Sequence, residues 1–149
     1  MQADHCSYPF LRARWFALAL GAALPAIAVF AVGPRLGLHA AVPGPLYVFL
    51  IAAPVVEELV FRGLLQGWLL RRAELTRTWA AGVSGANVLT SLAFAGAHLW
   101  REPWPWAVAT LVPSLVFGFA RERSNGVVAP CVLHIAYNGA MAAGLWLGV

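Results

Sequence analysis

Lysine is absent from this 149-residue chain, and charged residues of all kinds make up only 11% of it. The ten basic residues are therefore all arginines. They occur singly or in twos and threes along the chain, and do not form the basic patch that marks a nucleic-acid-binding surface. We therefore predict no nucleic-acid partner, despite the formal net charge of +4.

Cysteine is almost as scarce. The two residues, Cys6 and Cys131, are too few and too unlike in setting for a disulfide framework. The chain also lacks a CxxC pair, an HExxH motif and a glycine-rich phosphate loop, which are the usual signs of a metal or nucleotide site. We therefore predict neither a cofactor nor a bound metal.

What the chain has in abundance is apolar residues, at 61% of its length. A helix needs roughly 20 apolar residues to cross a bilayer. Runs of about that length cover residues 15–32, 46–70, 80–100, 104–120 and 127–149. The first run resembles a signal peptide but is long for a signal core, so we interpret it as a spanning helix. The predicted fold class is all-α, a polytopic membrane helix bundle of about five transmembrane helices that forms a single domain, 1–149.

The arginines predict the orientation of this bundle. Residues 1–14, 71–79 and 121–126 carry two, three and two arginines and fall on the same side of a five-span chain. The opposite side has only Arg35 and Arg101. Because an excess of basic residues marks the cytoplasmic side, we predict a cytoplasmic N-terminal segment and an outward C-terminus. The protein would be a multi-pass component of the inner (plasma) membrane, in contact with the lipid bilayer.

Three charged residues interrupt the second apolar run. Glu57, Glu58 and Arg62 lie inside it, and a charge in the middle of a membrane costs at least ~2.5–3.5 kcal/mol. Glu58 and Arg62 are four residues apart, so they can form an ion pair on one helix face. A structural ion pair needs only one acid, which makes the second glutamate a candidate for function. Pro54, one turn earlier, removes a backbone hydrogen bond and can kink the helix.

Further polar residues lie in the third and fifth runs. Asn87, Thr90 and His98 lie in the third run, while His134 and Asn138 share a helix face in the fifth. Each residue taken singly is explained by a hydrogen bond between helices. Taken with the two acids and the arginine, they are the residue types that general acid–base chemistry requires.

These groups follow one another in a recognisable order. The three patterns are Glu57-Glu58-x-x-x-Arg62, Phe94-x-x-x-His98 and His134-x-x-x-Asn138. They resemble the three motifs of the CPBP family, the CAAX-protease and bacteriocin-processing intramembrane endopeptidases. The resemblance covers residues 46–149, which would form the catalytic core. It implies a membrane-anchored or C-terminal-signal protein as substrate, since some short bacterial members are paired with C-terminal sorting signals.

The resemblance also implies a role for each motif residue. Glu57 would be the general base that deprotonates a water, and His98 would hold and polarise that water. His134 and Asn138 would stabilise the oxyanion of the tetrahedral intermediate. The ion pair of the first motif would support the site.

Simple helix geometry opposes this assembly. At about 1.5 Å of rise per residue, His134 lies about 10 Å from the cytoplasmic side, Glu57 about 20 Å and His98 close to 30 Å. Straight, upright helices would therefore keep the three side chains apart. Tilts of about 20° are usual in membranes and, with a kink, can close such gaps.

Other functions use the same residue types. A zinc protease could use His98, His134 and a glutamate as ligands, although no HExxH is present and Asn138 has no good role as a ligand. A non-catalytic immunity or scaffold protein would gain stability by losing its buried charges. A proton or ion carrier also uses intramembrane acids, but explains His134 and Asn138 poorly. The identity of the substrate and the oligomeric state are open at this point.

Overall fold

The computed structural model describes residues 8–33, 44–79 and 82–148. Within these ranges the regular structure is helical, apart from an isolated antiparallel bridge between Thr78 and Ser84. The predicted all-α fold is confirmed. The helices, in chain order, are η1 (Pro9–Arg12), α1 (Arg14–Gly21), α2 (Leu24–Val32), η3 (Val48–Ala52), α3 (Ala53–Glu58), η4 (Leu59–Gln66), α4 (Gly67–Leu69), α5 (Ala73–Thr76), α6 (Gly85–His98), α7 (Trp104–Ala109), α8 (Leu111–Ser124) and α9 (Val128–Leu147).

Two of the predicted spans are long and apolar enough to cross a membrane as helices, by length and composition alone: Arg14–Val32 and Val128–Leu147. The second predicted span is helical from residue 46 to residue 69, but it contains three charges and two π-helical segments, η3 and η4. The fourth is divided at Thr110 into α7 and α8. Helices therefore occupy all five predicted runs, while the count of five membrane crossings remains a prediction.

The third span begins later than predicted. The expected run was 80–100, but α6 starts only at Gly85, and the two residues before Gly82 lie outside the described ranges. Gly82 has a φ of +73°, in the left-handed region that favours glycine and that a continuing helix excludes. Ser84 then caps the helix, because its side chain accepts a hydrogen bond from the Asn87 backbone N–H at 3.0 Å.

The predicted loop at 121–126 is mostly helix. The α8 helix continues to Ser124 and ends where Asn125 takes a left-handed φ of 49°. Arg121 and Arg123 therefore belong to its last turn, where basic side chains interact favourably with the helix dipole. The apolar pattern did not predict this last turn, because the apolar run stops at residue 120 and the helix continues through charged residues.

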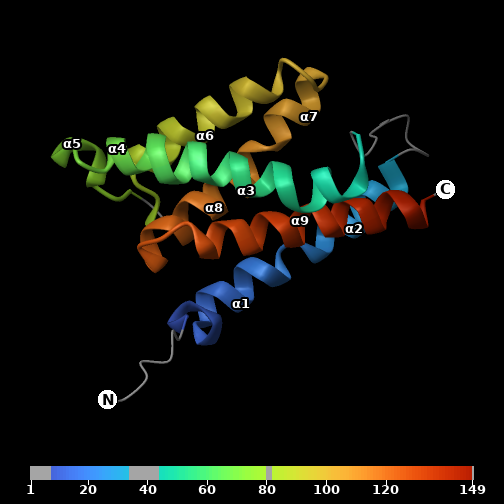
Figure 1. Cartoon of the computed structure of the whole chain (residues 1–149), viewed down its shortest axis with the longest axis horizontal. Helices are drawn as coiled ribbons and strands as arrows, with labels where there is room; N and C mark the ends of the chain where they lie inside the picture. Colours follow the sequence, from blue (N-terminus) through green and yellow to red (C-terminus); the bar gives the residue numbers. More distant parts are fainter. Residues whose placement is uncertain (1–7, 34–43, 80–81, 149) are drawn as a thin grey trace.

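The long C-terminal helix α9 packs against α2, α3 and α8, as Figure 1 shows. Glycine permits the closest contacts. A Cβ on Gly144 would collide with the Ile27 carbonyl of α2, and a Cβ on Gly118 of α8 would collide with the Asn87 side chain of α6. Small residues at helix interfaces are the usual way for membrane helices to pack closely.

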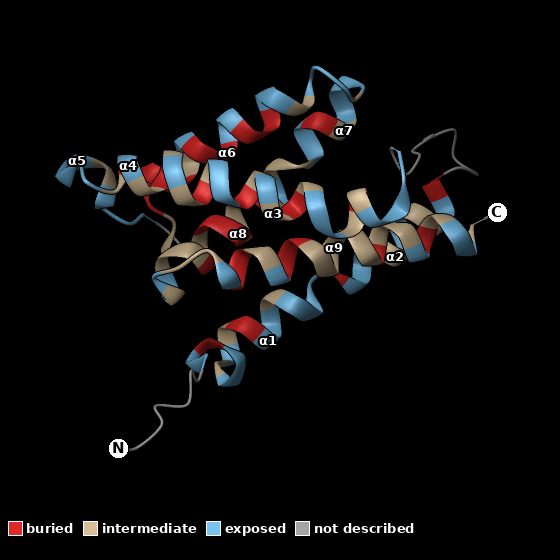
Figure 2. Ribbon diagram, viewed as in Figure 1, coloured by how far each residue is buried: buried red, intermediate tan, exposed pale blue. Residues whose placement is uncertain are grey.

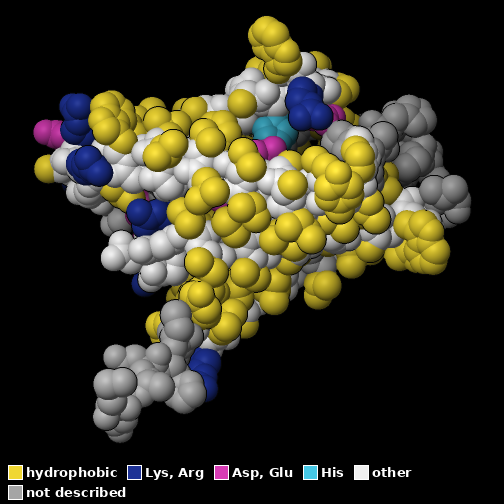
Figure 3. Space-filling model, viewed as in Figure 1, with side chains coloured by type: hydrophobic (Ala, Val, Ile, Leu, Met, Phe, Trp, Pro, Cys, Tyr) yellow, Lys and Arg dark blue, Asp and Glu magenta, His cyan; other side chains and the backbone are white. Residues whose placement is uncertain are grey.

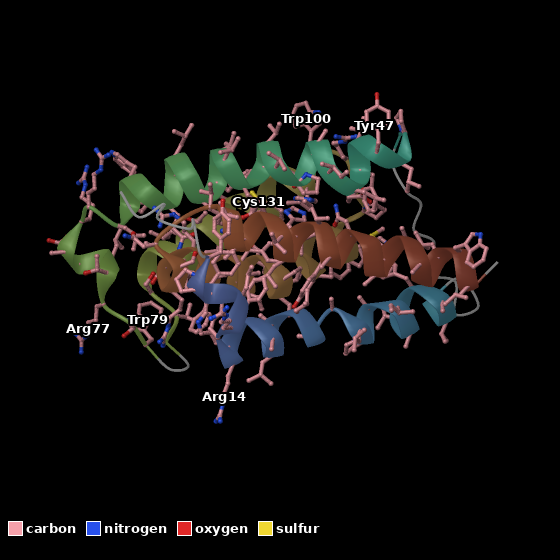
Figure 4. The ribbon with its side chains drawn as sticks, turned by 60° about the horizontal axis from the view of Figure 1, so that its bottom comes forward. Arg14, Tyr47, Arg77, Trp79, Trp100 and Cys131 are labelled. Atoms are coloured by element: carbon pink, nitrogen blue, oxygen red, sulfur yellow. The ribbon has the colours of Figure 1, made fainter. Side chains whose placement is uncertain are left out.

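Polar residues are buried inside the bundle, and many large apolar residues lie on its surface (Figures 2 and 3). Within the described ranges, the fully buried polar side chains are Glu58, Arg62, Gln66, Ser84, Asn87, Thr90, Ser91 and Ser114. Tyr47 and Trp100, by contrast, are 69% and 93% exposed, and both point away from the helices in Figure 4. An apolar surface around a polar interior is expected for a helix bundle surrounded by lipid.

Several of the described connections lie toward two opposite ends of the molecule (Figure 1). The start of α1, the α4–α5 connection and the α8–α9 turn lie at one end, and the α6–α7 turn and the C-terminus at the other. Arg14 and Arg77, at the first of these ends, project outward (Figure 4). This alternation is the one that the orientation prediction requires; which end faces the cytoplasm remains a prediction.

Candidate active site

The two adjacent glutamates lie in different environments. Glu58 is completely buried, whereas the side chain of Glu57 is 31% exposed. Successive residues of a helix point about 100° apart, so Glu58 faces the neighbouring helices while Glu57 faces a cavity. One acid therefore belongs to the interior, and the other is accessible.

The predicted ion pair is present. The Nε atom of Arg62 donates to Oε2 of Glu58 at 3.1 Å, and neither side chain is exposed. A second nitrogen of the guanidinium, Nη2, donates to the hydroxyl of Ser114 on α8 at 2.7 Å. A buried charge pair is stable only when its remaining donors and acceptors also find partners, and Ser114 supplies one of them.

Glu58 also binds His134 on α9, a contact that the sequence analysis missed. The two atoms, Oε1 of Glu58 and Nδ1 of His134, are 2.9 Å apart. A carboxylate paired with Arg62 only accepts hydrogen bonds, so Nδ1 carries the hydrogen. The other ring nitrogen, Nε2, then points toward Glu57 and lies 3.8 Å from its Oε2 atom. No sequence spacing relates two residues that are 76 positions apart.

Aromatic rings fix both histidines. Phe117 stacks on His134 with ring centroids 4.8 Å apart, and Phe94 meets the same ring edge-on at 5.9 Å. Phe94 also contacts His98 at 4.5 Å, and the Nδ1 atom of His98 lies 2.9 Å from the Phe94 carbonyl. Because the carbonyl can only accept, Nδ1 carries the hydrogen and Nε2 of His98 remains available. One ring, Phe94, therefore lies between the two histidines.

Asn138 is held by the backbone carbonyl of Phe49, which lacks a hydrogen bond within its own helix because of Pro54. Its Nδ2 donates to the Phe49 carbonyl at 2.9 Å. In a π-helix an N–H bonds to the carbonyl five residues earlier, and Ala53 makes such a bond to Val48 at the end of η3. The next pair would join Pro54 to Phe49, but proline has no N–H. The Asn138 amide takes the place of that bond and keeps a second N–H and its oxygen for other partners.

Four of the predicted residues line one cavity of about 470 Å³: Glu57, His98, His134 and Asn138. Glu58 and Arg62 do not line the cavity; they lie behind Glu57 and His134. Much of the cavity wall is apolar, and Arg101 and Glu102 lie on it at the α6–α7 end. Figure 3 shows histidine, acidic and arginine side chains together in a hollow between apolar ones.

The separation in depth that straight, upright helices would impose is therefore not seen. His98 and His134 both contact the ring of Phe94, and both share the cavity with Glu57. Figure 1 shows that α6 slants relative to α3 and α9, so the helices are not the straight, upright set that the depth estimate assumed.

The described residues contain no group of three or more His, Cys, Asp and Glu side chains arranged to hold a metal ion. Glu57 and His134 come close to one another, but His98 is joined to them only through Phe94. The zinc alternative thus has no ligand cluster in this part of the chain.

The fold and the site together define an all-helical bundle in which acids and histidines line a cavity with largely apolar walls. Residues 39–140 match the sequence model of a family described as type II CAAX prenyl endopeptidase Rce1-like. The match covers more than half of the chain, and the chain belongs to this family. It is therefore a CAAX-protease-like intramembrane endopeptidase that acts on proteins. No curated protein and no solved structure matches it.

Proposed function

We propose that this chain is a glutamic intramembrane endopeptidase in which Glu57 activates the attacking water. The observation that supports it is the single cavity shared by Glu57, His98, His134 and Asn138. Of the two adjacent glutamates, only Glu57 reaches this cavity, so it is the one that can take a proton from water.

The proposed reaction begins with a water held between Glu57 and the histidines. Glu57 takes one of its protons while the oxygen attacks the peptide carbonyl, and His98 presents Nε2 to orient that water. The oxyanion is stabilised by the amide hydrogen of Asn138 that Phe49 does not use. A hydrogen on Nε2 of His134 would donate to the same oxyanion while the Nδ1 hydrogen stays bound to Glu58. The tetrahedral intermediate then collapses, and the C–N bond breaks as Glu57 returns its proton to the leaving amine.

The substrate in this proposal is a membrane-associated protein, cut near a membrane-proximal or C-terminal segment. The apolar cavity walls suit such a segment, and the family description names prenyl CAAX proteins as a substrate class. Within this class, processing of C-terminal sorting signals is the role that the resemblance to short bacterial members suggests. The enzyme would be a multi-pass protein of the inner membrane.

The test compares Glu57→Gln with the wild type in phospholipid nanodiscs. The probes are an internally quenched farnesylated CAAX peptide and a single-span reporter with a C-terminal transmembrane segment. Glutamine keeps the size of glutamate but cannot accept a proton, so cleavage should fall below detection while thermal stability is kept. The control is Glu74→Gln, which neutralises an exposed glutamate on α5 and should cleave as the wild type does.

Three results would contradict the proposal. The first is an active Glu57→Gln enzyme, and the second is a wild type that cleaves neither probe. The third is activity that is lost with a chelator and restored by zinc, which would make a metal the activator of the water.

A further inference from the structure

Two rows of residues face one another across the interface between the continuous helix α3–η4 and α8. One row consists of Glu58, Arg62 and Gln66, and the other of Ser114, Gly118 and Glu122. Arg62 donates to the Ser114 hydroxyl at 2.7 Å. One turn further on, Gln66 donates to the Gly118 carbonyl at 3.1 Å and to Glu122 at 2.8 Å. The rows keep the same four-residue spacing, so each helical turn of one is matched by a turn of the other.

Within this interface, Ser114 is the residue that touches the Glu58–Arg62 pair. Two other helices contact the Arg62 guanidinium: α8 through Ser114, and α6 through the Phe94 ring, whose centroid is 5.4 Å from Cζ. A ring face holds a cation with little directional preference, whereas a hydrogen bond fixes one nitrogen. Nη1 of Arg62 has no hydrogen-bond partner among the described residues. The orientation of the guanidinium therefore depends on Glu58 and Ser114.

The contacts then continue to the cavity. Arg62 holds Oε2 of Glu58, and the other carboxylate oxygen, Oε1, holds Nδ1 of His134. The ring so fixed places Nε2 at 3.8 Å from Glu57. A rotation of the guanidinium would turn the Glu58 carboxylate, and that would turn the imidazole.

We propose that Ser114 is a positioning residue of the active site, which acts through Arg62 and Glu58 to hold His134. The inference rests on the proposed function, because it assigns His134 to the chemistry. It adds a residue on α8, a helix that carries none of the three motifs. Ser114 does not line the cavity and touches no reacting atom, so its effect is entirely indirect.

The test is Ser114→Ala, compared with the matched control Ser91→Ala. Both serines are fully buried, and Ser91 bonds to Asn87 on its own helix, away from the cavity. For Ser114→Ala, kcat on the farnesylated CAAX peptide should fall about tenfold or more, with KM within about twofold, because small misplacements of catalytic groups slow the reaction more than they weaken binding. Ser91→Ala should keep the wild-type kcat, and Ser114→Thr, which retains the hydroxyl, should recover most of it.

A second readout needs no substrate. In protein labelled with ¹⁵N-histidine, the hydrogen on Nδ1 of His134 should give a resonance that is absent from His134→Gln. This resonance should broaden or shift in Ser114→Ala and stay unchanged in Ser91→Ala. Should Ser114→Ala not fold, Ser114→Cys, with a weaker acceptor of similar size, replaces it in both measurements.

The outcomes separate the inference from the proposed function. If Ser114→Ala loses thermal stability but keeps both kcat and the His134 resonance, the serine has only a packing role and the inference fails. If Glu57→Gln is inactive and Ser114→Ala fully active, the inference alone fails. If Glu57→Gln is active, the proposed mechanism fails, and the His134 resonance still decides whether Ser114 positions that ring.

Discussion

Glu57 and Glu58 are neighbours in the chain, yet the structure gives them separate surroundings. Glu58 has a partner on each oxygen, Arg62 on one and His134 on the other. Glu57 has a histidine at 3.8 Å and an opening to the cavity. Two like charges side by side are costly in an apolar medium, and this arrangement reduces the cost by pairing one of them and leaving the other accessible to water.

This difference predicts opposite effects of two similar substitutions on stability. Glu58→Gln should lower the unfolding temperature markedly, because removing one partner of a buried pair costs ~3–5 kcal/mol and leaves Arg62 without its charge partner. Glu57→Gln should leave the unfolding temperature unchanged or raise it. The measurement is thermal unfolding in detergent followed by tryptophan fluorescence. Equal destabilisation by both variants would show that the two acids share one structural role.

Asn138 combines a structural hydrogen bond with a proposed catalytic one. Asn138→Ala should lower kcat by ~10²–10³ with a much smaller change in KM, as expected for loss of an oxyanion donor. Asn138→Asp should not restore activity, since a carboxylate cannot donate to the Phe49 carbonyl or to an oxyanion. Steady-state kinetics of both variants provide the measurement. A rise in KM with kcat unchanged would instead assign Asn138 to substrate binding.

At the scale of the element, the helix that carries the first motif is irregular where it meets the site. The π-helical segment η3 ends at Ala52, and Pro54 prevents the pattern from continuing. The second π segment, η4, contains Arg62, whose backbone carbonyl accepts a hydrogen bond from Arg121 of α8 at 3.2 Å. Side chains of neighbouring helices thus satisfy carbonyls in both segments, which is how membrane helices tolerate such breaks.

Pro54 is therefore predicted to position Asn138 through the carbonyl it leaves free. In Pro54→Ala the new N–H can bond to Phe49 within the helix and compete with the Asn138 amide. We expect kcat to fall several-fold while the unfolding temperature holds or rises. The double variant Pro54→Ala with Asn138→Ala should be no slower than Asn138→Ala alone, because both changes act on one contact. Additive losses in kcat would mean that the proline acts elsewhere, for example through the shape of the cavity.

At the scale of the whole molecule, the arginine distribution predicts orientation. A reporter fused after Val149 should behave as extracytoplasmic, and one inserted in the 71–79 loop as cytoplasmic, because seven arginines lie on one predicted side and two on the other. Alkaline phosphatase and green fluorescent protein fusions at the two positions measure this directly. A cytoplasmic C-terminus would rule out five crossings and, with them, the predicted placement of the motif helices in the membrane.

The sequence by itself determined the class of protein and gave the predicted residues of the site. Apolar runs of membrane length, scarce charge and arginines at the ends of the runs are local properties, so they can be read without a structure. The three motifs are local too, since each fits within one helix. The Glu58–Arg62 pair could be predicted for this reason, because four residues of helix set its geometry.

Only the tertiary structure decided which residues of the three motifs contact one another, and which other residues connect them. The Glu58–His134 bond and the Asn138–Phe49 bond join residues 76 and 89 positions apart, and no helical period relates such pairs. Phe94 contacts both His98 and His134 because of how α6 packs against its neighbours, and Gly118 of α8 leaves room there for the Asn87 side chain. Ser114 had no sequence signal beyond being one polar residue in an apolar run. Its contact with Arg62 follows from the register between two helices, and side-chain packing along the whole interface sets that register.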